Sequence, residues 1–111
     1  MIIVNKNEGP KIPYTVSGNV ISFRDGELAL DLEKYERDFP VHIDICKNEF
    51  NMLTVGISKR YVAQIDIPAR EYEFVENGTD EQGNPKYDKV AVPFSLDKVT
   101  LTLWAIEGGN V

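Results

Sequence analysis

The amino-acid sequence predicts an all-β protein, an antiparallel β-sandwich of about eight or nine short strands, with a small open barrel as the alternative. Between residues 41 and 67 apolar and polar residues alternate with period two, which places each set on one face of a sheet. Turn-forming residues recur about every 8–12 positions, a spacing typical of sandwiches and barrels built from short strands. Residues 1–111 have the length of a single domain.

The first part of the chain contains a well-defined hairpin. Residues 12–16 alternate as a strand, and Pro13 favours an edge position because proline cannot donate to a sheet ladder. The apolar faces of residues 20–23 and 28–32 differ in parity, so an even number of residues must join them. Asp25-Gly26 supplies a two-residue turn that needs positive φ at both positions. The resulting register pairs Phe23 with Leu28 and Ile21 with Leu30.

The segment after this hairpin also carries a helical spacing. Leu28, Leu32, Tyr35 and Phe39 are separated by four, three and four positions, which fits one face of a helix. The hairpin competes for the same residues. We therefore expect a strand to Leu32 and at most one helical turn near residues 33–38.

Residues 41–67 are expected to form three consecutive antiparallel strands. Loops 47–51 and 58–60 both hold an odd number of residues, which suits strands whose apolar faces share the same parity. A slip of one residue would expose a whole apolar row, so the face that each strand buries is strongly specified. We expect each strand to pair with the next along the chain. The first pairing places Val41, Ile43 and Ile45 opposite Ile57, Val55 and Leu53. The second places Ile57, Val55 and Leu53 opposite Tyr61, Ala63 and Ile65.

After residue 67 the chain is expected to enter a second sheet. Pro68 ends the third strand, and the apolar phase then changes, which predicts a bend near residues 69–70. Residues 76–88, rich in Asp, Glu, Asn and Gly, are expected to form an exposed hairpin loop. The last strand, residues 99–106, has apolar side chains on both faces and is expected to lie inside a sheet. Residues 107–111 are expected to be a frayed tail.

The composition disfavours several classes of function. The net charge of −6 disfavours binding to nucleic acid or to an anionic membrane surface, because both carry negative charge. Residues 1–6 lack the features of a signal peptide, so we expect a cytoplasmic protein, or a virion protein if the chain derives from a phage. Cys46 is the only cysteine, which fits a reducing compartment and a half-buried structural side chain.

No residue pattern predicts catalysis, a metal or another cofactor. His42, Asp44 and Cys46 lie along one strand face at intervals of about 6.5–7 Å, too far apart for contact between a nucleophile and its base. In the predicted register His42 lies beside Gly56 and Asp44 beside Thr54, as the polar side of a sheet. The oxygen-rich segment 76–88 could hold Ca²⁺, but it lacks the ligand spacing of a calcium loop, which favours a solvated hairpin tip.

The sequence therefore favours a non-catalytic structural or protein-interaction module, whose partner is another protein or a second copy. Small assembly components of phages and other mobile elements have this character. Two alternatives stay open: a β-sandwich that binds a carbohydrate or another small ligand, and an enzyme that uses carboxylates such as Asp44 and Asp66. The candidate interaction residues are one aromatic side chain in a turn and the acidic side chains of the expected loop: Phe50, Glu76, Asp80, Glu81 and Asp88.

Overall fold

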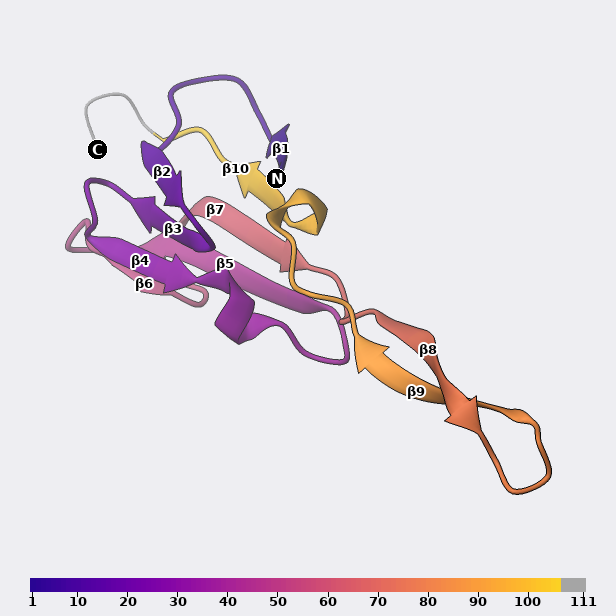
Figure 1. Cartoon of the computed structure of the whole chain (residues 1–111). Coiled ribbons are helices and arrows are strands. Elements are labelled where there is room, and N and C mark those ends of the chain that lie inside the picture. The colour runs from indigo at the N-terminus through magenta and orange to yellow at the C-terminus, as the bar shows by residue number, and fades with distance from the viewer. Residues whose placement is uncertain (107–111) are drawn as a thin grey trace.

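The computed structural model describes residues 1–106 and shows an all-β protein with three sheets and two short 3-10 helices (Figure 1). The largest sheet, here called the main sheet, has the strand order β1 (Ile2–Asn5), β10 (Thr100–Leu103), β7 (Arg60–Ile67), β5 (Val41–Lys47) and β6 (Leu53–Val55). The small sheet has the order β2 (Tyr14–Ser17), β3 (Val20–Phe23) and β4 (Leu28–Asp31). The third sheet pairs β8 (Tyr72–Thr79) with β9 (Pro85–Ala91). The helices are η1 (Leu32–Tyr35) and η2 (Leu96–Lys98).

The all-β prediction is confirmed, and within residues 1–106 no sheet closes into a barrel. The hairpin of β3 and β4 has the predicted register, with Phe23 opposite Leu28. Asp25 and Gly26 take φ values of 57° and 86°, the positive values that the turn requires. Strand β2 lies at an edge of the small sheet, and the single helical turn η1 follows β4, both as expected.

The predicted order of the three strands between residues 41 and 67 is wrong. Strand β5 lies between β6 and β7, so Ile43 pairs with Ile65 of β7. On its other side Ile45 pairs with Val55, two positions away from the predicted register. Parity fixes the face that a strand buries, but it does not fix the neighbour, because β6 and β7 have the same parity. The longer β7 covers more of the apolar row of β5, and the short β6 takes the exposed edge.

The main sheet is mixed rather than wholly antiparallel. Strand β1, which the sequence analysis did not identify, pairs in parallel with β10, with Ile3 opposite Leu101. The β-branched run Ile2-Ile3-Val4 was the available signal, although it lacks alternation. Strand β10 pairs with β1 on one side and β7 on the other, which confirms its predicted interior position.

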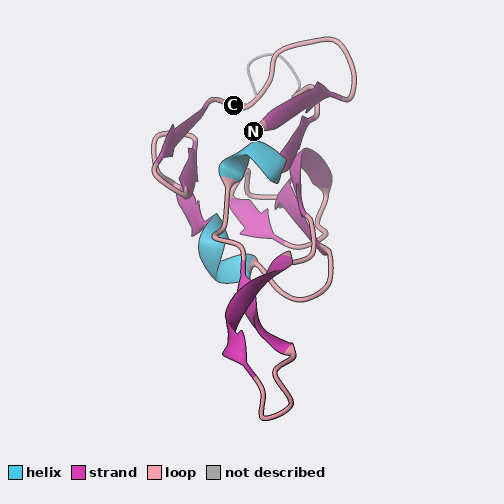
Figure 2. Cartoon of the chain, turned by 45° about the vertical axis from the view of Figure 1, so that its right-hand side comes forward, coloured by secondary structure: helices cyan, strands magenta, loops and turns pink. Residues whose placement is uncertain are grey.

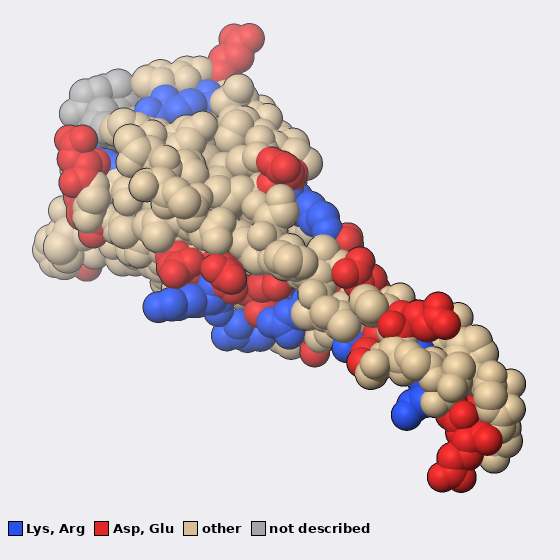
Figure 3. Space-filling model, viewed as in Figure 1, with Lys and Arg blue, Asp and Glu red and all other residues tan. Residues whose placement is uncertain are grey.

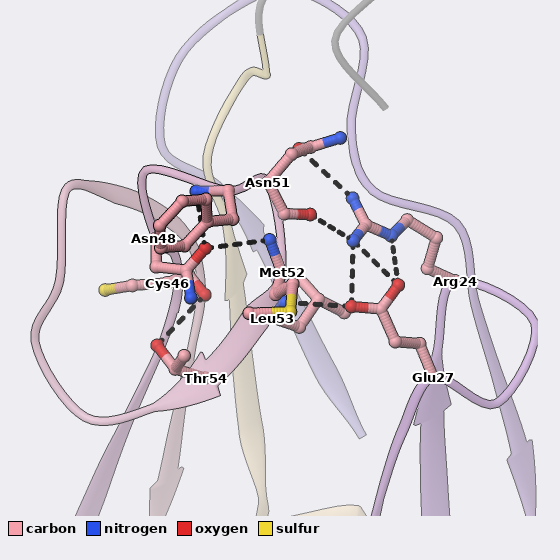
Figure 4. A network of polar contacts seen from close by, with 9 residues as sticks. Arg24, Glu27, Cys46, Asn48, Asn51, Met52, Leu53 and Thr54 are labelled. Carbon is pink, nitrogen blue, oxygen red and sulfur yellow. Dashed lines mark hydrogen bonds and ion pairs between the residues drawn. The ribbon is translucent and has the colours of Figure 1, made fainter.

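One hydrophobic core joins residues of the main and small sheets. Phe23 and Ile65, one from each sheet, are both completely buried. Side chains at one end of the molecule also connect the two sheets (Figure 4). Arg24 Nη2 donates to the Asn51 carbonyl oxygen at 2.6 Å, and Glu27 Oε2 accepts from the Leu53 backbone N–H at 2.9 Å. The hydrogen bond from Leu53, followed by that from Arg24, lowers the pKa of Glu27.

Strands β8 and β9 form a hairpin that extends away from the rest of the molecule (Figures 1 and 2). We call residues 72–91 the arm and residues 1–71 with 92–106 the body. Within the described residues, the arm strands hydrogen-bond to each other and to no strand of the other two sheets. The molecule measures 69 × 22 × 21 Å and has a radius of gyration of 19.0 Å. A compact domain of this length would have a radius of gyration of about 13 Å.

The strands of the arm extend into the segment expected to be a loop. Strand β8 continues to Thr79 and β9 begins at Pro85, so the turn of the arm comprises residues 80–84. The bend after Pro68 does lead into another sheet, but that sheet contains the arm alone. The expected frayed tail, residues 107–111, lies outside the described residues.

Candidate functional site

The arm has two faces that both expose apolar side chains. Glu76 pairs with Tyr87, and Phe74 pairs with Lys89, so Phe74 and Tyr87 lie on the same face as diagonal neighbours. Phe74 is 70% exposed and Tyr87 is 58% exposed. The opposite face carries the exposed side chains of Val75 and Val90. Both faces of this two-stranded hairpin therefore expose apolar side chains to solvent.

Polar contacts hold the root of the arm on the body. Tyr72 Oη donates to the carboxylate of Asp38, and Arg70 donates to Asp38 and to Glu36. The Lys89 ammonium lies 4.3 Å from the centre of the Tyr72 ring. Hydrogen bonding by Tyr72 is the largest cause that lowers the pKa of Asp38, and the charge of Arg70 adds to it. The contacts fix the position at which the arm leaves the body.

The predicted interaction residues lie in two separate places. Glu76, Asp80, Glu81 and Asp88 all belong to the arm. Asp80 organises the turn, because its Oδ1 accepts the backbone N–H groups of Gln82 and Asn84, and Asp88 accepts a hydrogen bond from Asn77. The exposed acidic side chains are distributed along the arm (Figure 3).

Phe50 is 72% exposed and lies in the turn between β5 and β6. This turn follows the end of β5, whereas the arm root lies beside the start of β5, where Val41 pairs with Ile67 (Figure 1). The structure therefore does not bring Phe50 together with the acidic residues of the arm. Other exposed apolar side chains accompany Phe50 along the β6 edge: Met52, Val55 and Ile57.

A cleft with basic and aromatic walls occupies the body at the end remote from the arm. The rings of Tyr61 and Trp104 stack with their centres 5.2 Å apart, and the Lys6 ammonium lies 5.6 Å from the Trp104 ring centre. The cleft has a volume of about 290 Å³. We call it the basic cleft, and its lining residues are Lys47, Lys59, Arg60, Tyr61, Trp104, Ala105 and Ile106.

The sequence analysis did not identify the basic cleft. The run Lys59-Arg60-Tyr61 was its only local signal. The stacking of Tyr61 on Trp104 depends on the pairing of β7 with β10, which local patterns do not specify.

A ladder of polar side chains crosses the outer face of the main sheet. His42 Nδ1 lies 2.6 Å from Asp66 Oδ1, and its Nε2 lies 2.8 Å from Asp44 Oδ1. Gln64 Nε2 donates to Asp44, and Gln64 Oε1 accepts from the Trp104 indole at 2.9 Å. The expected position of His42 beside Gly56 is wrong, because β7 rather than β6 supplies the neighbours of His42.

The charge state of His42 follows from this geometry. Both ring nitrogens face carboxylate oxygens, which accept hydrogen bonds, so the doubly protonated ring satisfies both contacts. The hydrogen bond to Asp66, followed by that to Asp44, raises the pKa of His42. Hydrogen bonding by Gln64 and then by His42 lowers the pKa of Asp44. The ladder therefore stabilises the protonated ring of His42 and the ionised carboxylate of Asp44.

Both ring nitrogens of His42 contact carboxylates, so neither is directed at the thiol of Cys46. Cys46 is completely buried, more than expected, and burial raises the pKa of its thiol. Asp44 and Asp66 each contact one of the two ring nitrogens of His42. A pocket of about 250 Å³ lies beside His42 and Asp66. Within residues 1–106 no group of three or more His, Cys, Asp and Glu side chains is arranged to hold a metal ion.

Replacing His42 with glutamine is expected to flatten the dependence of stability on pH. Because the folded pKa of His42 is raised, its contribution is complete below the unfolded value of about 6.5 and is lost as the pH rises through the folded value. His42 is about half exposed, so the effect is less than about 1 kcal/mol. It is measured as the change in Tm between pH 6 and pH 7.5, and equal slopes for the two proteins would contradict it. His42 is the only histidine in the chain, so no other imidazole contributes.

Comparison with known proteins gives no relative from which a function could be transferred. No family model, no curated protein and no solved structure matches the chain. Among the described residues, none belongs to a helix that is long and apolar enough to cross a membrane.

Proposed function

We propose that the protein is a non-catalytic structural or protein-interaction module whose contact surface is the arm. The observation that carries the proposal is the exposure of Phe74 and Tyr87 on a hairpin that projects from the body. An isolated two-stranded hairpin is only marginally stable in water. Covering its aromatic face with another protein surface would stabilise it and remove apolar area from water.

The body suits the role of a rigid scaffold for this arm. We propose that the main and small sheets, which share one core, form a β-sandwich. The parallel edge strand β1 exposes Ile2, Ile3 and Val4, which gives a second surface on which a protein could pack. A small assembly component of phage or mobile-element type, located in the cytoplasm or in a virion, is the class of protein that we propose.

The stacked pair Tyr61 and Trp104 favours a second candidate function, the binding of a carbohydrate or another small ligand. Small-molecule pockets usually have volumes of about 300–1,000 Å³. The basic cleft, at about 290 Å³, lies just below this range. We therefore propose protein contact through the arm, rather than ligand binding in the basic cleft, as the main function.

The double variant Phe74→Ser, Tyr87→Ser is expected to abolish self-association. Light scattering coupled to size exclusion would measure the mass over an about hundredfold range of concentration. The unchanged protein is expected to exceed its monomer mass of 12.6 kDa as the concentration rises. The double variant is expected to stay at the monomer mass, because removing two central aromatic anchors weakens binding by more than about 100-fold.

The matched control is Phe39→Ser, which makes the same change at an exposed phenylalanine outside the arm and the basic cleft. This control should associate like the unchanged protein. Association that survives in the double variant, or a monomer at every concentration for the unchanged protein, would count against the arm as a surface for self-association.

A further inference from the structure

We infer that the arm of one copy docks in the basic cleft of a second copy, so that the molecules join head to tail. This inference rests on the proposed function, since it identifies the partner and the receiving surface of the same arm. Three features of the structure support it: the charges of the two surfaces, their side-chain chemistry and their positions at opposite ends of the molecule.

The charges of the arm and the basic cleft are complementary. The arm holds five carboxylates and two lysines, a net charge of −3. Lys59 is an exposed cation in the lining of the basic cleft, and the Lys6 ammonium lies over its Trp104 wall. Opposite charges favour the encounter of an arm with a cleft. Two arms that met each other would instead bring together two surfaces of the same sign, which disfavours a symmetric contact between arms.

The side chains are also complementary. On the aromatic face of the arm, Tyr87 lies directly opposite Glu76, so an aromatic ring and a carboxylate are presented together. The basic cleft offers the aromatic wall of Tyr61 and Trp104 next to Lys59. Its volume of about 290 Å³ is large enough to admit an aromatic side chain. We assign Tyr87 as the side chain that enters the cleft and Glu76 as the group that faces Lys59, since buried aromatic anchors dominate protein contacts.

The positions of the two surfaces determine the kind of assembly. The arm follows the end of β7 at Ile67, whereas Arg60 and Tyr61 at the start of β7 line the cleft. The two ends of this eight-residue strand lie roughly 23 Å apart. Each copy therefore has the arm at one end of β7 and the cleft at the other. A contact of this kind is heterologous and builds a ring or an open filament.

An exchange of charges tests the assigned pair. Glu76→Lys and Lys59→Glu are each expected to weaken self-association by about tenfold or more, because each places like charges in contact. The double variant Glu76→Lys, Lys59→Glu is expected to recover most of the lost affinity. Lys34→Glu makes the same change as Lys59→Glu at an exposed lysine of η1, outside the basic cleft, and should leave association unchanged.

A mixing experiment tests the polarity of the contact. Tyr87→Ser damages the arm and leaves the cleft intact, whereas Lys59→Glu damages the cleft and leaves the arm intact. Each variant alone should be a monomer at concentrations where the unchanged protein associates. Their equimolar mixture should form a species of twice the monomer mass and stop there, because only one intact arm and one intact cleft can meet in each pair. Circular dichroism and Tm would show that each variant remains folded.

The outcomes separate this inference from the proposed function. If Tyr87→Ser abolishes association and Lys59→Glu does not, the arm is the contact surface but the cleft does not receive it, and the inference is wrong. If both variants abolish association but their mixture stays monomeric, the contact is symmetric, and the inference is also wrong. If no association depends on the arm, both the inference and the self-associating form of the proposed function fail.

Discussion

A variant in which an Asn-Gly turn replaces residues 73–90 is expected to fold normally and to remain monomeric at every concentration. Tyr72 and Ala91 are paired at the root of the arm, so a two-residue turn can join them without moving the body. The core lies in the main and small sheets and includes no residue of the arm. The radius of gyration is expected to fall from 19.0 Å to about 12–13 Å, the value for a compact chain of the remaining length.

Small-angle scattering at low protein concentration would measure this change, and thermal unfolding would measure the stability. A Tm within a few degrees of the unchanged protein would show that the arm contributes little to the fold. A loss of cooperative unfolding would contradict the expectation that the body folds without the arm.

Two phenylalanine substitutions are expected to differ widely in their effect on stability. Phe23 is completely buried between the two sheets, whereas Phe74 is 70% exposed on the arm. Phe23→Ala is expected to lower the free energy of unfolding by about 3–5 kcal/mol, because it removes buried apolar area and leaves a cavity. Phe74→Ala is expected to lower it by less than about 0.5 kcal/mol, as is usual for exposed positions.

Denaturant unfolding at low protein concentration would measure both values. If Phe23→Ala does not fold, Phe23→Leu provides a milder variant, with an expected loss of about 1 kcal/mol. Similar losses for Phe23→Ala and Phe74→Ala would contradict the exposed position of the arm. They would indicate that the arm packs against the body in solution.

The sequence was sufficient to predict the structure where the determining contacts are local. The Asp25-Gly26 turn and the parity of its two flanking strands specify one register, and the structure has that register. The alternation between residues 41 and 67 correctly identified buried residues such as Ile43 and Ile65. It could not identify the partner of each strand, because two strands of equal parity compete for the same apolar row.

The candidate site, like the fold, could be predicted from the sequence only where local residues determine the structure. The acidic residues of segment 76–88 were correctly expected on the surface, since turn-forming and charged residues mark exposed segments. The sequence left open whether Phe50 faces solvent or folds back over the sheet edge, and the structure exposes it. The change of apolar phase after residue 67 predicted that the chain enters a second sheet, and it gave no sign that Phe74 would stay exposed there. The polar ladder around His42 and the basic cleft both require the pairing of β7 with its neighbours, which is a non-local property.

The most direct test of the central claim is amide hydrogen exchange of the arm at low and high protein concentration. An uncovered two-stranded hairpin is marginally stable, so the amides of residues 72–91 should exchange rapidly in the monomer. If the arm docks on another copy, these amides should become protected as the concentration rises, while those of β5 and β7 stay protected throughout. Rapid exchange of the arm at every concentration would contradict the claim that the arm is the surface through which copies of this protein associate.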